Sequence, residues 1–171
     1  MKSIEVLTAN DFSEFIYEWL KINCKNTKVI AKASKYKISF FTPFKKCRLI
    51  EELIPLYAAI GAYSIYQKFN KNEKCLDAIT KSFIDKVNNG IVLDLSKADD
   101  NYSLNFKNRF SDYLGHLNES AEFSGISTSF LRYLHKDRKN TFDLESNIFL
   151  SSIIDEKHAS LLNMLSKFDL K

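Results

Sequence analysis

Glycine and proline are scarce in this chain, which has four glycines and two prolines among its 171 residues. Because turns between strands depend on these residue types, the scarcity disfavours a many-stranded sandwich and favours long helices with short connections. The glycines are also isolated, so the sequence lacks glycine-rich phosphate loops and the nucleophile elbow of hydrolases. The sequence therefore predicts an all-α, two-lobed bundle of about seven helices.

Cysteine and histidine are few, and their spacing fits neither a redox pair nor a zinc site. No two cysteines form a CxxC pair, which indicates reduced thiols, and no two histidines are four residues apart, as a zincin helix requires. We therefore expect no catalytic residues, no metal and no cofactor, in a protein that is not an enzyme. The residues concerned are Cys24, Cys47, Cys75, His116, His135 and His158.

Two of the histidines, His116 and His158, allow other interpretations that the sequence supports less well. His116 and Glu119 lie three residues apart, a spacing used in di-metal bundles, but only one such motif is present, so a surface pair is favoured. A hydrolase that uses His116 with carboxylates is the corresponding minor alternative. His158 lies on the apolar stripe of the last predicted helix, where a histidine bonded to a carbonyl at the edge of the core is expected.

Long apolar runs are missing as well. No stretch reaches the roughly 18 uninterrupted apolar residues of a membrane span. The most apolar window, 50–66, contains Glu51, Glu52 and Pro55 and predicts a buried core helix. Residues 1–12 lack the pattern of a secretory leader, so we expect a cytoplasmic protein without a membrane partner. With 45% hydrophobic residues the chain can bury a sizeable core.

Apolar residues at helical spacing predict most of the elements. The segment 27–42 is helical or extended, with strand-like alternation over 36–41, and the short apolar run at 91–95 is likewise helical or extended. A polar linker at 96–101 divides an N-terminal lobe, 1–95, from a C-terminal lobe, 96–171, unless the two form one continuous domain. The predicted helices cover 11–25, 44–53, 55–69, 73–88, 104–117, 129–135, 144–153 and 155–168.

Local signals predict where several of these helices begin and end. Asn10 or Asp11 caps the first helix, and Pro55 opens a helix of its own. A left-handed cap at 88–90 ends the helix before it, and 119–128 is a loop that contains Gly125. Thr141 or Asp143 caps a helix whose predicted apolar face comprises Leu144, Ile148, Phe149, Ser152 and Ile153.

Lysine and arginine gather in two groups, within a net charge of +4. Such groups can follow a phosphate backbone, and interleaved aromatic rings can stack on unpaired bases. The alternative to nucleic-acid binding is that the basic residues only make the surface soluble and that the phenylalanines lie in the core. The first group comprises Lys25, Lys28, Lys32, Lys35, Lys37, Lys45, Lys46 and Arg48, with Tyr36, Phe40, Phe41 and Phe44 between them. The second comprises Arg132, His135, Lys136, Arg138 and Lys139, with Lys157, Lys167 and Lys171 as possible neighbours.

Four stretches resemble one family, in the same order along most of the chain. They look like the opening helix, the proline–aromatic–basic stretch and the two C-terminal helices of the small, CasB-type subunit of the type I-E CRISPR surveillance complex, Cascade. The chain carries lysines where the family has paired arginines in its first lobe, and His135 where it often has arginine. The matching stretches are Glu14–Lys21, Phe41–Lys46, Phe130–Arg138 and Asp155–Leu165.

The resemblance implies a non-enzymatic, all-helical subunit in antiviral defence. Its implied partners are the other Cascade subunits and guide RNA, the backbone of target and displaced DNA, and a second copy of itself. The rival hypothesis is a small helical interaction protein, such as an immunity protein or a phage-encoded inhibitor. The residues implied in nucleic-acid binding are Lys35, Lys45, Arg132, His135, Arg138 and Lys171, to which charge alone adds Lys136 and Lys139.

Overall fold

The computed structural model of the chain describes residues 5–37, 43–91, 102–120, 123–135 and 143–170. This described part forms a helical bundle, as predicted, with one pair of three-residue strands. The strands are β1 (Glu5–Leu7) and β2 (Phe168–Leu170). The helices are α1 (Ala9–Lys25), α2 (Thr27–Ala33), α3 (Pro43–Phe69), α4 (Glu73–Lys86), α6 (Tyr102–Ser120), α7 (Phe123–His135) and α8 (Leu144–Leu165), with a π-turn, η1 (Val87–Ile91), after α4.

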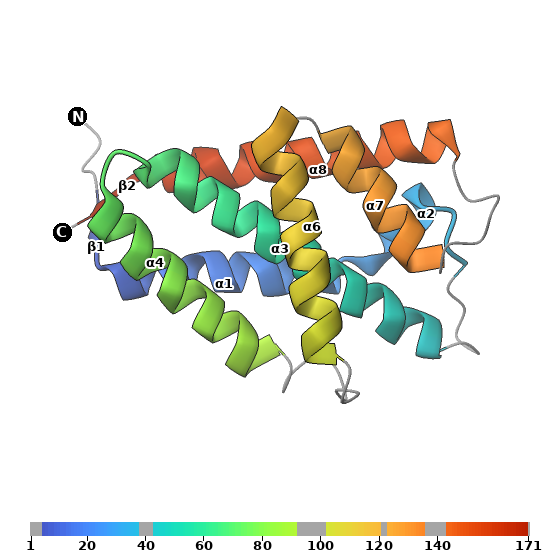
Figure 1. Cartoon of the computed structure of the whole chain (residues 1–171), viewed down its shortest axis with the longest axis horizontal. Helices are drawn as coiled ribbons and strands as arrows, with labels where there is room; N and C mark the ends of the chain where they lie inside the picture. The colour runs from blue at the N-terminus through green and yellow to red at the C-terminus, as the bar shows by residue number, and fades with distance from the viewer. Residues whose placement is uncertain (1–4, 38–42, 92–101, 121–122, 136–142, 171) are drawn as a thin grey trace.

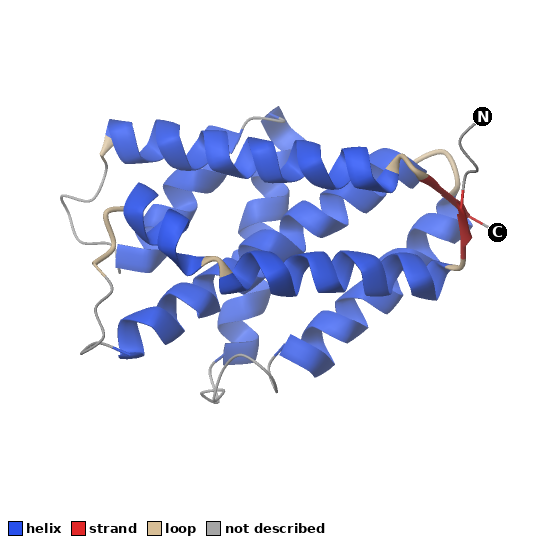
Figure 2. Cartoon of the chain, turned by 180° about the vertical axis from the view of Figure 1, so that it is seen from behind, coloured by secondary structure: helices blue, strands red, loops and turns tan. Residues whose placement is uncertain are grey.

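Helix α3 is the centre of the bundle. It runs the length of the molecule, with α6 crossing in front of it and α8 above it (Figure 1). From behind, α1 and α8 lie nearest the viewer (Figure 2). Small residues let the neighbours approach α3 closely: a Cβ added at Gly61 would lie 2.9 Å from Phe83 Cζ and 3.0 Å from Ile16 Cγ2. The predicted core helix over 56–66 is therefore part of α3.

Pro55 lies inside α3 and does not begin a separate helix, so the predicted break there is wrong. Proline lacks the backbone N–H and normally costs a helix interior about 3 kcal/mol. Here the flanking residues Leu53, Ile54, Leu56 and Tyr57 are all buried. Their burial in one core holds both halves of α3 on a common path and outweighs the local cost.

The caps also differ in part from the sequence prediction. Thr8, and neither Asn10 nor Asp11, caps α1: its side chain accepts a hydrogen bond from the Asp11 backbone, and Asp11 Oδ2 accepts one from the Thr8 backbone at 3.0 Å. Asp143 caps α8 as predicted, accepting from Glu145 N at 3.3 Å.

The predicted left-handed cap at 88–90 is wrong, because the chain continues from α4 into the π-turn η1. None of the described glycines has a positive φ. Gly90 has a steric role instead: a Cβ at this position would collide with the Tyr17 hydroxyl.

The predicted loop over 119–128 is helical wherever it is described, since α6 reaches Ser120 and α7 begins at Phe123. Gly125 permits α7 to pass close to α6. A Cβ there would lie 2.8 Å from His116 Nδ1. The glycine that suggested a turn is thus a point of close helix contact.

The two helices predicted over 144–153 and 155–168 are one helix, α8. Its apolar face was assigned wrongly at the start, where Leu144, Ile148 and Phe149 are exposed. Ser146 and Asn147 face inward there. Asn147 donates to Thr128 Oγ1 at 3.0 Å and accepts from Ser127 Oγ, so hydrogen bonds to α7 decide which face is buried.

The ends of the described chain meet through β1 and β2, which the sequence did not reveal. The strands are parallel, with Glu5 opposite Phe168 and Leu7 opposite Leu170. Lys68, near the end of α3, donates to the carbonyl oxygens of Leu165 and Phe168, each at 2.6 Å. Burial lowers the pKa of this lysine.

Several sequence predictions fall outside the described residues: most of the alternating segment 36–41, the run 91–95 after Ile91, and the linker 96–101. The division into lobes stays a prediction. One core cluster contains residues from both sides of the proposed boundary, as the alternative of one continuous domain requires. No helix in the described part is long and apolar enough to cross a membrane.

Candidate nucleic-acid interface

Arg132 and His135, the described residues of the second basic run, lie at the same end of the bundle as the lysines of the first group; this end is here called the basic end. It is built from α2, the start of α3, the end of α7 and the start of α8, at the right of Figure 1. His135 joins the groups directly, because its Nε2 lies 3.1 Å from the carbonyl oxygen of Ser34. The Tyr36 and His135 rings also pack edge to face, with centroids 5.6 Å apart. Charges that are distant in sequence thus share one surface.

Arg48 has a structural role at this end. Its Nη2 donates to the carbonyl oxygen of Tyr133 at 2.6 Å, and its Nε donates to that of Leu134 at 3.1 Å. The last carbonyls of a helix lack partners within the helix and carry partial negative charge. Arg48 therefore satisfies the end of α7 and fastens it to α3.

Lys35 also turns toward the protein. Its Nζ forms ion pairs with Asp143 and, at 3.1 Å, with Glu145. The bond to Asp143, then that to Glu145, raises the pKa of Lys35, and Lys35 in turn lowers the pKa of Asp143. Its φ of 51° is left-handed, in the turn that follows the end of α2. The predicted phosphate ligand thus already has two carboxylate partners.

Arg132 lies on the outer side of α7. Its Nη2 is 3.9 Å from Asp112 Oδ2, and its guanidinium lies 5.2 Å from the centre of the Tyr133 ring. The Tyr133 hydroxyl donates to the same carboxylate at 3.0 Å. The Arg132 side chain is nevertheless 53% exposed, so its charge reaches the surface beside the basic end.

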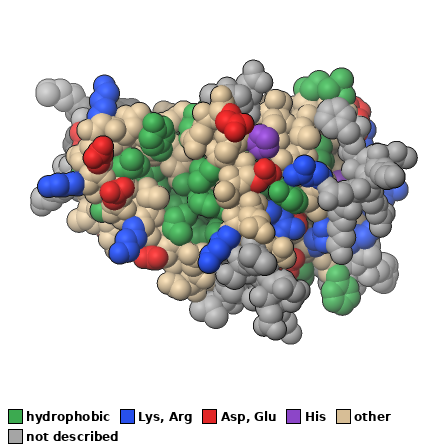
Figure 3. Space-filling view, viewed as in Figure 1, with side chains coloured by type: hydrophobic (Ala, Val, Ile, Leu, Met, Phe, Trp, Pro, Cys, Tyr) green, Lys and Arg blue, Asp and Glu red, His purple; other side chains and the backbone are tan. Residues whose placement is uncertain are grey.

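The strongest candidates for binding an anion are exposed lysines. They lie at the end of α1, on α2 and shortly after it, and in the first turn of α3, where Phe44, next to Lys45 in the chain, is 85% exposed. Part of this end is visible at the right of Figure 3. Flexible ammonium groups beside an exposed ring can contact phosphates and stack on a base. The lysines are Lys25, Lys28, Lys32, Lys37, Lys45 and Lys46.

The predicted site residues therefore divide into three sets. Lys45 and Arg132 are exposed at or beside the basic end. Lys35 and His135 lie there but make internal contacts. Lys136, Arg138, Lys139 and Lys171 lie outside the described residues.

A buried charge pair that the sequence did not predict lies between α3 and α6. Glu52 is only 3% exposed, and its Oε2 is 2.5 Å from Arg109 Nε, an ion pair formed without a well-aligned hydrogen bond. Burial raises the pKa of Glu52 to about 7, against the opposing effects of Arg109 and Arg48. The hydroxyl of Tyr113 is buried nearby without a described hydrogen-bond partner. Glu52 offered only one signal, an acidic residue within an apolar run.

The described residues assemble no metal centre: no group of three metal-ligating side chains occurs among them. His116 Nε2 lies 3.1 Å from Ser129 Oγ, in a helix contact. His158 is buried, with ring centres 5.5 Å from Tyr63 and 5.3 Å from Phe123. Its Nε2 has no hydrogen-bond partner in the described part of the chain, so the expected carbonyl bond is not made by that atom. Burial raises the pKa of the Cys24 thiol, which makes it unreactive.

Comparisons of the chain with protein-family models, with curated proteins and with solved structures find no match. A functional assignment therefore depends on the geometry of the basic end and on the patterns in the sequence.

Proposed function

We propose that this chain is a non-enzymatic, cytoplasmic nucleic-acid-binding subunit that holds phosphate backbones at its basic end. A single observation carries the proposal: a contact between Ser34 and His135, 101 residues apart, brings the end of α7, which carries Arg132 and His135, to the end of α2 and its lysines. A phosphate backbone presents closely spaced negative charges, and its affinity for protein grows with the number of cations that follow it.

Internal and external cations have different roles in this proposal. Arg48, Lys35 and His135 hold α2, α3, α7 and α8 together through the contacts described above. The exposed lysines of α2 and α3 then contact phosphates, and Phe44 is available to stack on an unpaired base. Binding follows charge and shape and is largely independent of base sequence.

The Cascade small-subunit resemblance supplies the biological setting of the proposal. In that setting the chain braces a guide-RNA complex and holds target or displaced DNA. The test is to assemble a Cascade complex that lacks its small subunit and add this chain. Restored target-DNA binding supports the setting, whereas no incorporation would reject it and leave the phosphate-binding surface to be tested separately.

The substitution Lys32→Ala/Lys45→Ala/Lys46→Ala tests that surface. We expect weaker binding of single- and double-stranded DNA and RNA, and a slope of log K against log salt that is shallower by about 2 to 3 because three phosphate contacts are lost. Fluorescence anisotropy of labelled oligonucleotides across a salt series measures both quantities.

The matched control is Lys71→Ala/Lys74→Ala/Lys81→Ala, which removes the same charge from exposed positions near and on α4. Net charge alone would weaken binding equally in both triple variants. Equal affinity and slope in the two variants would contradict a phosphate site at the basic end.

A second candidate function is protein binding by the start of α8. Leu144 and Ile148 are each 62% exposed and Phe149 is 51% exposed, on one short stretch of helix. Exposed apolar side chains in such a row are typical of an interaction surface. If Leu144→Ser/Ile148→Ser abolishes capture of a protein partner while nucleic-acid affinity is unchanged, the interaction-protein alternative is favoured.

A further inference from the structure

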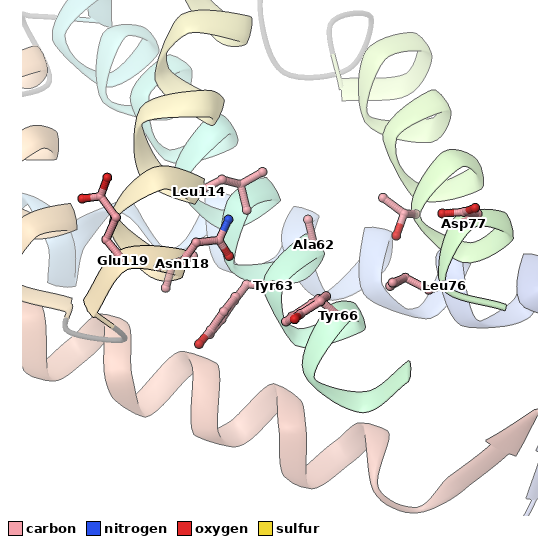
Figure 4. Close-up of a pocket in the computed structure, with 10 residues that line it drawn as sticks. Ala62, Tyr63, Tyr66, Leu76, Asp77, Leu114, Asn118 and Glu119 are labelled. Carbon is pink, nitrogen blue, oxygen red and sulfur yellow. The ribbon is translucent and has the colours of Figure 1, made fainter. Parts of the chain in front are cut away.

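A groove of about 700 Å³ opens between α3, α4 and α6, on the face shown in Figure 3 and in close-up in Figure 4. Its lining residues belong to none of the segments that form the basic end, so neither surface depends on the other. Helix α3 forms its floor, and α4 and α6 form opposite walls. Its lining comprises Ala62, Tyr63 and Tyr66 from α3, Leu76, Asp77 and Thr80 from α4, and Leu114, Leu117, Asn118 and Glu119 from α6.

The floor and the rim of the groove differ in character. Apolar and aromatic groups form the floor, where Tyr66 remains 49% exposed. The two carboxylates stand at opposite sides, Asp77 on α4 and Glu119 on α6 (Figure 4). Glu119 is next to the last residue of α6, where the helix dipole adds negative potential. Among the ten described lining residues none is basic, although the chain carries a net charge of +4.

We propose that this groove binds an amphipathic helix of a partner protein, with apolar side chains on the floor and lysine or arginine against Asp77 and Glu119. An apolar centre with a polar rim is the anatomy of a protein interface, in which tyrosine is a frequent anchor. A small-molecule site instead needs polar groups that converge on the ligand. The diverging helices α4 and α6 leave α3 uncovered between them, which suits a helix laid into a groove.

The test uses a synthetic helical peptide of about 18 residues, or about 27 Å of helix, with leucine on one face and lysine beside it. The same peptide with glutamate for lysine is the charge control. We expect the lysine peptide to bind saturably by fluorescence anisotropy and to bind at least about tenfold more tightly than the glutamate peptide.

Two groove variants locate the binding. Asp77→Lys/Glu119→Lys should weaken the lysine peptide about tenfold, whereas Asp85→Lys/Glu156→Lys, with the same change of net charge, should not. Tyr66→Ala should also weaken binding, and Ile22→Ala, which removes an exposed apolar side chain on α1 outside the groove, is its control. All four variants change exposed positions, and unchanged melting temperatures will show that folding is intact.

Other results would overturn the proposal. It fails if the lysine peptide does not bind saturably, or if groove and control variants bind it equally. Binding of 1-naphthylmethylamine in the groove without peptide binding would assign the groove to a small apolar cation. A dimer in sedimentation experiments that Asp77→Lys/Glu119→Lys dissociates would assign it to a second copy of the chain.

Discussion

At the scale of single residues, the Glu52–Arg109 pair couples stability to pH. Because burial raises the pKa of Glu52 from 4.5 to about 7, the folded state holds a proton that the unfolded state releases. The stabilisation from this proton is complete below about pH 4.5 and is lost as the pH rises through 7. Arg109, Arg48 and Glu51 are the charged groups that act on Glu52 in this window.

We predict that Glu52→Gln reduces the pH dependence of unfolding. The wild-type free energy of unfolding should fall between about pH 5 and pH 8 by at most about 3 kcal/mol through this group, and the variant should lose most of that decline. Urea denaturation at several pH values measures the difference. His158 opposes the trend, because burial lowers its pKa and favours folding at higher pH, so the comparison with the variant is the informative one.

The control for this prediction is Glu156→Gln, an exposed carboxyl on α8. An identical pH profile for wild type and Glu52→Gln would show that Glu52 has an ordinary pKa in the folded protein. A steeper decline in the variant would show that Arg109 holds Glu52 ionised throughout.

At the scale of elements, helix contacts decide which glycines are replaceable. Gly61→Ala should destabilise the protein by about 2 kcal/mol, because its Cβ would press on Phe83 and Ile16 in a filled core. Gly115→Ala should stabilise it by up to about 1 kcal/mol, because α6 gains helix propensity and a Cβ there meets no described atom within 4 Å. Thermal and urea unfolding of the two variants measure these opposite effects.

Equal changes in Gly61→Ala and Gly115→Ala would contradict this account. The pair is internally controlled, since both substitutions add one methyl group within a helix. A shift of the near-ultraviolet circular dichroism in Gly61→Ala alone would place its effect in aromatic packing around Phe83.

The sequence was sufficient to predict that most of the helices exist, but often not the residues at which they begin and end. Helical periodicity is local, so six of the eight predicted helices lie within an observed helix, and the other two, 73–88 and 155–168, extend two or three residues past its end. Pro55 and Gly125 are residue types that often end a helix or form a turn. The predicted helix break at Pro55 and the predicted loop around Gly125 were both wrong, because packing against distant segments outweighs these local preferences. At the start of α8, two different faces satisfy the helical period, and only the bonds of Asn147 to α7 choose between them.

At the scale of the whole molecule, the positions of the charges could be predicted but their partners could not. The sequence singled out the basic residues of the described part that lie at or beside the basic end, such as Lys45 and Arg132. It could not show that Lys35 meets Asp143 or that Arg48 reaches α7, since those pairs form only when distant elements pack. The groove was missed for the same reason: its ten lining residues come from three helices.

At the end of the bundle opposite the basic end, Lys68 connects α3 to the chain segment that leads from α8 into β2. We predict that Lys68→Met destabilises the protein by about 1 kcal/mol or more, because the carbonyls of Leu165 and Phe168 lose a charged donor. Hydrogen exchange over 166–170 should accelerate more than exchange in α6. Lys71→Met, at an exposed position nearby, is the control, and equal exchange in both variants would contradict the prediction.

The parallel pairing of β1 and β2 has a mechanical consequence. Glu5 at the start of β1 lies opposite Phe168 at the start of β2, while the chain leaves through the beginning of one strand and the end of the other. Tension between the two termini therefore loads the ladder bonds in shear, all at once, and does not peel them apart one after another. When the described part is pulled at both ends, this pair of strands would resist stretching before any helix is pulled from the core.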